Sequence, residues 1–157
     1  MDAQPRLRRA TNADAEQIRA LVYGVLEEYG LKPDPGSTDA DLDDLEQSYL
    51  APGGTFRVLE DPDGAVIGAY GLHRIDSDTC ELRKMYLSRS RRGKGHGKRL
   101  LDDALARARE LGFTRVTLET ASALKEAIAL YERYGFVPYH PDHLSARCDQ
   151  AYILALK

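Results

Sequence analysis

The chain is poor in the residues and segments that define secreted and membrane proteins. It has 2 cysteines and no tryptophan in 157 residues, and a pair of cysteines is too few for a disulfide framework. The N-terminal segment lacks the uninterrupted apolar stretch of a signal peptide, and no window approaches the length of a membrane span. We therefore expect a cytoplasmic protein without a membrane partner, built as a single domain over residues 1–157.

The chain also lacks a large excess of either charge: it has 22 Lys and Arg and 25 Asp and Glu, which gives a formal net charge of −3. A broad nucleic-acid-binding surface is therefore not expected. The charges are unevenly placed: residues 89–99 are rich in Lys and Arg, whereas residues 33–56 contain no basic residue and several aspartates. Such an acidic run is usually a solvated helix face. A binding site for a cationic substrate is the alternative.

Residues that commonly bind metals occur, but their spacing does not form a site. His140, His143 and Cys148 are neighbours in sequence, yet a tetrahedral zinc site needs a fourth ligand, and the nearest candidate, Cys80, is remote. The acidic run lacks the glycine and the final glutamate of a calcium-binding loop. No metal is expected.

The periodicity of apolar residues predicts a chain that alternates between helices and strands. Helical spacing predicts a helix that follows the capping residues 11–14 and runs to Tyr29, and further helices over residues 38–50, 95–111 and 124–134. Alternation and turn residues predict strands over residues 7–10, 56–60, 65–74, 79–87, 115–119, 136–139 and 151–156. The mixture indicates an α/β protein without repeats.

The most informative segment is a turn rich in glycine and cations, residues 92–98, between a predicted strand and a predicted helix. Its glycines allow a ligand close to the backbone, so that consecutive amides can point into one concavity at the positive end of the helix. A pyrophosphate group is the expected occupant. Spacing excludes two familiar phosphate loops: a Walker loop needs glycine at Arg92 and Ser or Thr at Arg99, and a dinucleotide fingerprint needs glycine at Lys98 or Leu100.

The pattern that remains, Arg92-x-x-Gly95-x-Gly97, resembles the coenzyme-binding signature of the GNAT superfamily of N-acetyltransferases. The segment Ala127-x-x-Leu130-Tyr131-x-x-x-Gly135-Phe136 is similar to the second signature of that family and lies at the expected distance. The resemblance covers nearly the whole chain. It implies the family fold, a central mixed, mostly antiparallel sheet of about seven strands, splayed between strands 4 and 5 and flanked by about four helices.

The resemblance implies an acyltransferase that uses acetyl-CoA as co-substrate and no metal. In the family the pantetheine arm lies between the splayed strands and bonds the backbone of the fourth strand, which corresponds here to Met85, Tyr86 and Leu87. The pyrophosphate would lie on the turn formed by Arg92, Gly93, Lys94, Gly95, His96, Gly97 and Lys98.

An amine that attacks a thioester must lose a proton, and the leaving thiolate must gain one. Glu81 is the candidate base, because it lies four residues before Met85 on one predicted strand and hence, by strict alternation, on the same face. The alternative for Glu81 is a surface or ion-paired carboxylate. Tyr131 matches the family tyrosine that serves as the acid, and the alternative is an aromatic side chain packed in the core.

The acceptor side of the site is less well defined by the sequence. Many members of the family carry an asparagine in the loop after the fifth strand, but the only asparagine here is Asn12, so Ser122 is the candidate to replace its contact with the coenzyme. Glu119 is a candidate second carboxylate for the amine. In the family the first two helices usually help to form the acceptor site, and the candidates there are Tyr23, Glu27 and Tyr29.

We expect a small-molecule amine as acceptor, such as an amino acid, a polyamine or an amine-bearing drug or toxin. A peptide or protein N-acetyltransferase and a non-catalytic sensor that binds an acyl-CoA in the same fold stay open as alternatives. Binding of nucleic acid through residues 89–99 is not expected, because the total charge is negative. Homodimers are common in the family, although the sequence does not define the oligomeric state.

Overall fold

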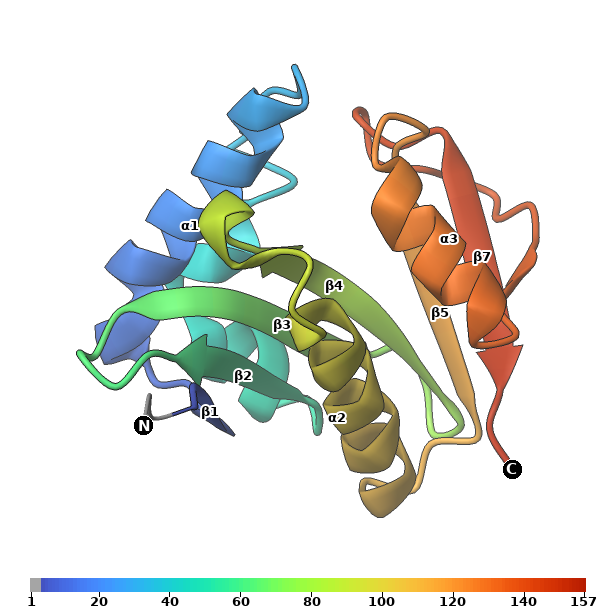
Figure 1. The fold of residues 1–157 in the computed structure, drawn as a ribbon. Coiled ribbons are helices and arrows are strands. Elements are labelled where there is room, and N and C mark those ends of the chain that lie inside the picture. Colours follow the sequence, from blue (N-terminus) through green and yellow to red (C-terminus); the bar gives the residue numbers. More distant parts are fainter. Residues whose placement is uncertain (1–3) are drawn as a thin grey trace.

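The computed structural model describes residues 4–157 as one seven-stranded sheet with helices on both faces (Figure 1). The strands are β1 (Arg6–Arg9), β2 (Thr55–Glu60), β3 (Val66–Arg74), β4 (Thr79–Leu87), β5 (Arg115–Thr120), β6 (Val137–Pro138) and β7 (Gln150–Ala155). Their order is β1-β2-β3-β4-β5-β7-β6. Neighbours are antiparallel except β4 and β5, which run parallel. The predicted mixed, mostly antiparallel sheet is confirmed.

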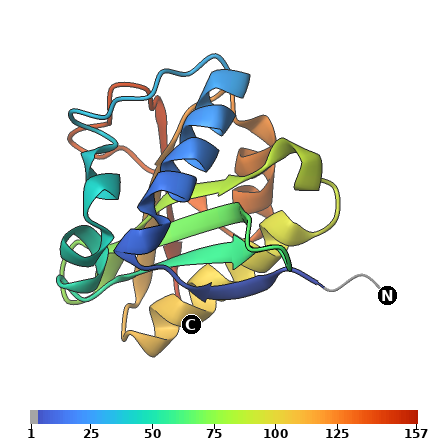
Figure 2. The same ribbon diagram turned by 90° about the vertical axis from the view of Figure 1, so that its left-hand side faces the viewer.

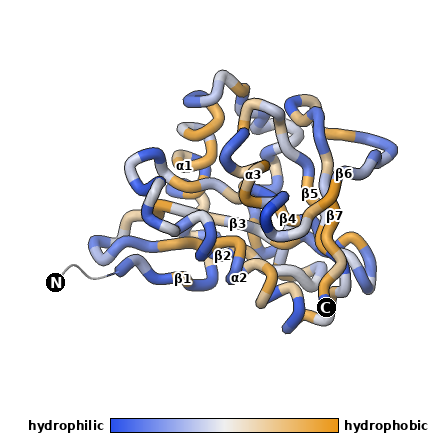
Figure 3. The backbone as a smooth tube through the Cα atoms, turned by 45° about the vertical axis from the view of Figure 1, so that its right-hand side comes forward, coloured by the Kyte–Doolittle hydropathy of each residue, from blue (hydrophilic) through white to orange (hydrophobic). Residues whose placement is uncertain are grey.

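Three α-helices pack on this sheet: α1 (Ala15–Glu28), α2 (His96–Glu110) and α3 (Lys125–Arg133). A capping box starts the first helical segment, since the Thr11 hydroxyl accepts from the Ala13 amide and the Asp14 carboxylate accepts from the Thr11 amide. One buried cluster joins α2 and α3 to the sheet, and a second joins α1 to the opposite face (Figure 2). Apolar residues follow β5 and β7, whereas the turns between elements are polar (Figure 3). Among residues 4–157, no helix is both long and apolar enough to cross a membrane.

The helix predicted over residues 38–50 is wrong. The segment forms two short pieces instead, the 3-10 helix η2 (Ala40–Asp43) and the single π-turn η3 (Glu46–Leu50), separated by extended backbone at Asp44. The aspartates, which accept backbone and side-chain hydrogen bonds readily, favour turns over helix interiors. Asn12 reinforces the break, because its side-chain oxygen accepts from the Leu45 amide at 2.8 Å.

A β-bulge interrupts β4. The register pairs Ala69 with Tyr86 but Gly71 with Arg83, so β4 carries one residue more than β3 between these pairs, and Lys84 has a φ of 55°. A positive φ is costly for a residue with a Cβ. Leu82 and Met85 both pack against the cluster of α2 and α3. The expectation that Glu81 and Met85 share a face is therefore wrong: Glu81, the neighbour of Leu82, points to the opposite face.

The two parallel strands separate beyond the bulge, as Figure 1 shows. Their pairing runs from Thr79 opposite Arg115 to Leu82 opposite Leu118 and then stops, although β4 continues to Leu87. The predicted splay between the fourth and fifth strands is confirmed. Among the described residues, the backbone of residues 83–87 consequently has no strand partner on the β5 side.

Candidate active site

The splay opens a cavity of about 930 Å³ between β4, β5, the start of α2, the end of α1 and α3. Strand β4 contributes all residues from Glu81 to Leu87 to its wall, and Tyr131 faces it from α3. The segment 144–148, which leads into β7, and the segment 34–41 line its other end. The glycine-rich turn, the free edge of β4 and the candidate acid and base therefore line one cavity.

The glycine-rich turn has the backbone that an anion site requires. Gly93 and Gly95 have φ values of 79° and 84°, and Gly95 is the N-cap of α2. Apart from the adjoining residues, no atom of residues 4–157 lies within 4 Å of where a Cβ would stand on either glycine. The turn therefore presents open space at the amide end of a 15-residue helix, where a pyrophosphate is favoured.

The side chains of this turn have different roles. Gly93, Gly95, Gly97 and Lys98 line the cavity, whereas Lys94 and His96 are not among the lining residues. His96 is buried beneath the turn, and this burial, with the nearby cations, holds its pKa below the ordinary value.

Arg92 ties the turn to the end of α1 (Ala15–Glu28). Its guanidinium donates to the Leu87 carbonyl at 3.0 Å, pairs with Glu28 and lies 5.3 Å from the centre of the Tyr29 ring. Besides its expected role as a pyrophosphate ligand, Arg92 therefore holds the turn against α1 through the Glu28 carboxylate and against the end of β4 through the Leu87 carbonyl.

The candidate base and acid approach the cavity from opposite walls. Glu81 has a side chain 13% exposed and accepts a hydrogen bond from Arg83 Nε. Tyr131 is 5% exposed and packs edge-on against Phe136 at 5.6 Å between ring centres. Burial, with the charge of nearby Tyr86, raises the pKa of Tyr131 far above its ordinary value, so the hydroxyl stays protonated. Within residues 4–157 the Tyr131 hydroxyl has no hydrogen-bond partner and remains available to a ligand.

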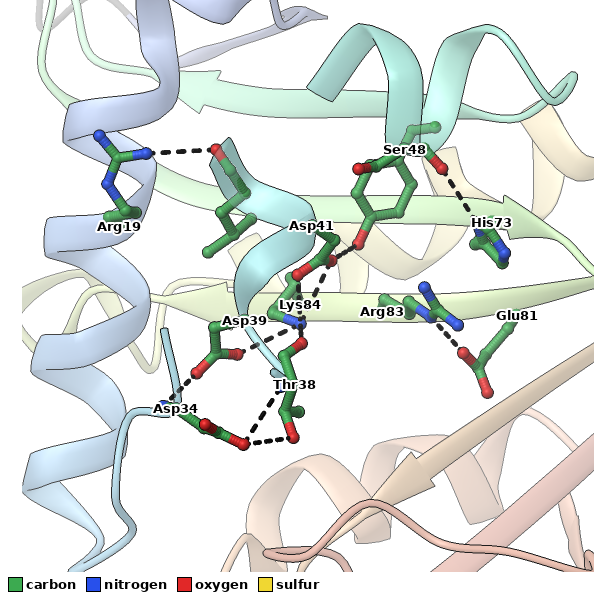
Figure 4. A network of polar contacts seen from close by, with 12 residues as sticks. Arg19, Asp34, Thr38, Asp39, Asp41, Ser48, His73, Glu81, Arg83 and Lys84 are labelled. Carbon is green, nitrogen blue, oxygen red and sulfur yellow. Dashed lines mark hydrogen bonds and ion pairs between the residues drawn. The ribbon is translucent and has the colours of Figure 1, made fainter. Parts of the chain in front are cut away.

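Behind the bulge lies a buried ion cluster, formed by Asp39, Asp41, Lys84 and Arg147. Figure 4 shows Lys84 between the two aspartates. Lys84 Nζ lies 3.3 Å from Asp39 Oδ1 and 3.2 Å from Asp41 Oδ1. Arg147 donates to both oxygens of Asp39, at 2.6 and 2.8 Å. Burial raises the pKa of Asp39, but the hydrogen bonds from Arg147 and the Asp34 amide and the charge of Lys84 outweigh it and hold the pKa below its ordinary value.

This cluster changes the interpretation of the acidic run. Asp39 is fully buried and Asp41 nearly so, and both are neutralised by cations of this chain. These two aspartates are neither a solvated helix face nor a free cation site. Sequence reasoning missed the cluster, although a lysine buried in a strand does require a carboxylate partner.

The other predicted acceptor and coenzyme residues divide between the cavity and its surroundings. Tyr29 and Glu119 line the cavity, and Glu119 accepts from the Ser145 amide at 2.8 Å. Tyr23 and Glu27 do not line it. Ser122 is also outside the lining, because its amide and hydroxyl both donate to Asp149 at 2.8 Å. Across residues 4–157 no three His, Cys, Asp or Glu side chains gather to hold a metal ion.

Comparisons with known proteins agree with this arrangement. The acetyltransferase (GNAT) family model matches residues 22–136. The uncharacterized N-acetyltransferase YjgM of Escherichia coli K12 is 47% identical over 137 residues, which cover 84% of this chain and 81% of that protein.

Two solved structures show the shared fold. An acetyltransferase of the GNAT family from Staphylococcus aureus Mu50 has a TM-score of 0.91 at 23% identity and covers 98% of this chain and 99% of its own. Spermidine N-acetyltransferase from Vibrio cholerae, in complex with CoA and spermine, has a TM-score of 0.71 at 21% identity and covers 97% and 95%. With its glycine-rich turn, its splayed strands and a family match over more than half its length, the chain belongs to the acetyltransferase (GNAT) family.

Proposed function

We propose that this protein transfers the acetyl group of acetyl-CoA to the primary amine of a small molecule, with Glu81 as the base and Tyr131 as the acid. Acetyl-CoA-dependent N-acetylation follows from the family, and the choice of residues and of a small acceptor is our own. The observation that supports it most is that both side chains face one cavity at the point where β4 and β5 separate.

The residues present fit acetyl-CoA. The open turn at Gly93 and Gly95 would hold the pyrophosphate, and the unpaired backbone of Met85, Tyr86 and Leu87 would bond the pantetheine arm as a further strand does. Acetyl-CoA supplies the thioester, whose carbonyl a backbone amide near the bulge would polarise.

The proton transfers balance with these two groups. Glu81 accepts a proton from the substrate ammonium, the resulting amine attacks the thioester carbon, and the C–N bond forms as the C–S bond breaks. The nitrogen, which becomes positively charged as the C–N bond forms, loses its second proton to solvent when the tetrahedral intermediate collapses. Tyr131 donates its proton to the leaving thiolate and regains one from solvent, while Glu81 releases its proton to solvent, so that one proton is released in total. The raised pKa of Tyr131 supports the role of donor, because the hydroxyl stays protonated throughout the usual assay range.

A small acceptor is supported by the ion cluster at the far end of the cavity. Arg147, from the segment before β7, and Asp39, from the segment after α1, are 108 positions apart in sequence yet form a two-bond ion pair. This pair joins the two segments that line the acceptor end. An extended peptide would have to displace a buried pair, at a cost of several kcal/mol, roughly 3 to 5.

The test measures thiol release from acetyl-CoA with a panel of amines. At saturating acceptor we expect Glu81→Gln to lower kcat by about 100-fold or more and Tyr131→Phe by about 10- to 100-fold. Matched controls are Glu132→Gln, at an exposed position beside Tyr131, and Tyr152→Phe, on β7 away from the cavity. Unchanged kcat in both cavity variants would refute the assignment of the acid and base.

A further inference from the structure

Arg83 is a cation at the acceptor end of the cavity whose side chain is accessible to a ligand. The side chains of Lys84 and Arg147 are 5% and 12% exposed and are held by the buried ion cluster. The Arg83 side chain is 33% exposed, lines the cavity, and within residues 4–157 forms an ion pair with Glu81 alone. Figure 4 shows this pair along β4, apart from the cluster.

Binding of an amine at Glu81 would disturb this pair. An ammonium that takes over the Glu81 carboxylate removes the ion-pair partner of Arg83 and leaves it only the weaker attraction of Asp41, which already pairs with Lys84. A partly buried cation without a close partner is costly. When Glu81 then accepts the proton, it becomes neutral, and the positive charge of Arg83 opposes that step. A substrate that brings its own negative charge to Arg83 offsets both effects.

This inference rests on the proposed function. We propose that the acceptor carries a carboxylate beside its amine, that Arg83 binds this carboxylate, and that the substrate class is therefore α-amino acids or close analogues. The planar guanidinium suits two parallel hydrogen bonds to a carboxylate. Glu81 and Arg83 are two residues apart on one strand and their charged ends are in contact, so the amine and the carboxylate that replace this contact must also be neighbours.

A polyamine fits this part of the cavity less well. Its second ammonium would find Asp39 and Asp41 already paired with cations, and Glu119 accepting from the Ser145 amide. It would also leave Arg83 without a partner. An amino acid satisfies Glu81 and Arg83 together.

The test compares each α-amino acid with its carboxamide, which keeps the amine and loses the charge, and includes spermidine as a polyamine. With saturating acetyl-CoA, we expect kcat/KM of the best amino acid to exceed that of its carboxamide by about 100-fold. Arg83→Gln should lower kcat/KM for the amino acid by about 100-fold, mainly through KM. It should not lower kcat/KM for the carboxamide, because the charge that opposes protonation of Glu81 is removed. Arg83→Lys should fall between, because it keeps the charge without the planar fork.

Two controls separate this result from a damaged fold. Arg74→Gln, at an exposed position of β3, should leave all rates unchanged, and acetyl-CoA affinity measured by calorimetry should be the same in Arg83→Gln and the parent protein. Equal or faster acetylation of carboxamides or spermidine would overturn the carboxylate assignment and leave the proposed acetyl transfer intact. Acetyl-CoA binding without acetylation of any amine would overturn the proposed function and this inference with it.

Discussion

The buried ion cluster predicts a large loss of stability on substitution of Lys84. Lys84→Met keeps the length and apolar stem of the side chain but removes the charge between two carboxylates, one fully buried and one nearly so. Breaking one partner of a buried pair costs about 3–5 kcal/mol. Because Asp39 keeps its two bonds from Arg147, we expect the lower end, about 3 kcal/mol, which for a chain of this size lowers Tm by roughly 6–12 °C.

The assay is denaturant unfolding of the parent protein, Lys84→Met, Asp41→Asn and the double variant. The double variant should be less destabilised than the sum of the two single ones, since residues in contact couple by about 1–3 kcal/mol. Lys98→Met is the matched control: its ion pair with Asp102 joins side chains 67% and 52% exposed, and no change in midpoint is expected. A midpoint for Lys84→Met equal to that of the parent would refute the reasoning.

Acid sensitivity gives the same prediction a second readout. Burial tends to raise the pKa of Asp39, but Arg147, the Asp34 amide and Lys84 together hold this pKa below its ordinary value. A carboxyl group with a lowered pKa stabilises the folded state above its unfolded pKa, near 3.8, and this contribution is lost as the pH falls further. Below that pH the parent protein should lose stability more steeply than Lys84→Met.

Four further predictions concern three glycines and the cavity thiol. Gly95→Ala forces a Cβ into a backbone with φ 84°, so it should cost about 1 kcal/mol and weaken acetyl-CoA binding in calorimetry. Gly24 lies in the middle of α1, and a Cβ added there meets no atom of another element within 4 Å. Gly24→Ala should therefore raise the free energy of unfolding by about 0.5–1 kcal/mol, measured by denaturant unfolding. Gly54→Ala would place a Cβ 1.8 Å from the Leu72 carbonyl oxygen and should prevent folding, as judged by circular dichroism. Burial raises the pKa of the Cys148 thiol to about 11, so mass spectrometry should show slow alkylation at pH 7 that bound acetyl-CoA slows further.

The strands and the main helices could be predicted from the sequence because each has a regular apolar period and a local stop. Gly112 and Gly135, for example, follow α2 and α3 with φ values of 91° and 96°, which few other residues adopt. Residues 38–50 could not be predicted in this way. Their conformation depends on Lys84 and Arg147, which are distant in sequence, and no local pattern reveals which aspartate meets which cation.

The sequence could predict that the glycine-rich turn, Glu81 and Tyr131 lie near one another, and all three line one cavity. It could not predict on which face of β4 the Glu81 side chain lies. The alternation rule places Glu81 beside Met85, and the bulge at Lys84 reverses that relation. Alternation holds only while each residue of a strand has one partner opposite it. In β4 the alternation fails close to the point where pairing with β5 ends.

The bulge and the ion cluster are best understood together. Lys84 adopts an unfavourable φ of 55°, which persists only where its surroundings over-determine it, and its ammonium is held from two sides by Asp39 and Asp41. The same bulge turns Met85 toward α2 and α3, where the glycine-rich turn lies, and leaves Glu81 and Arg83 on the other face. Lys84→Gly would relieve the strain but remove the ammonium that fixes the bulge. We therefore expect it to lower acetyl transfer, measured as thiol release, even where the relieved strain offsets part of the lost stability.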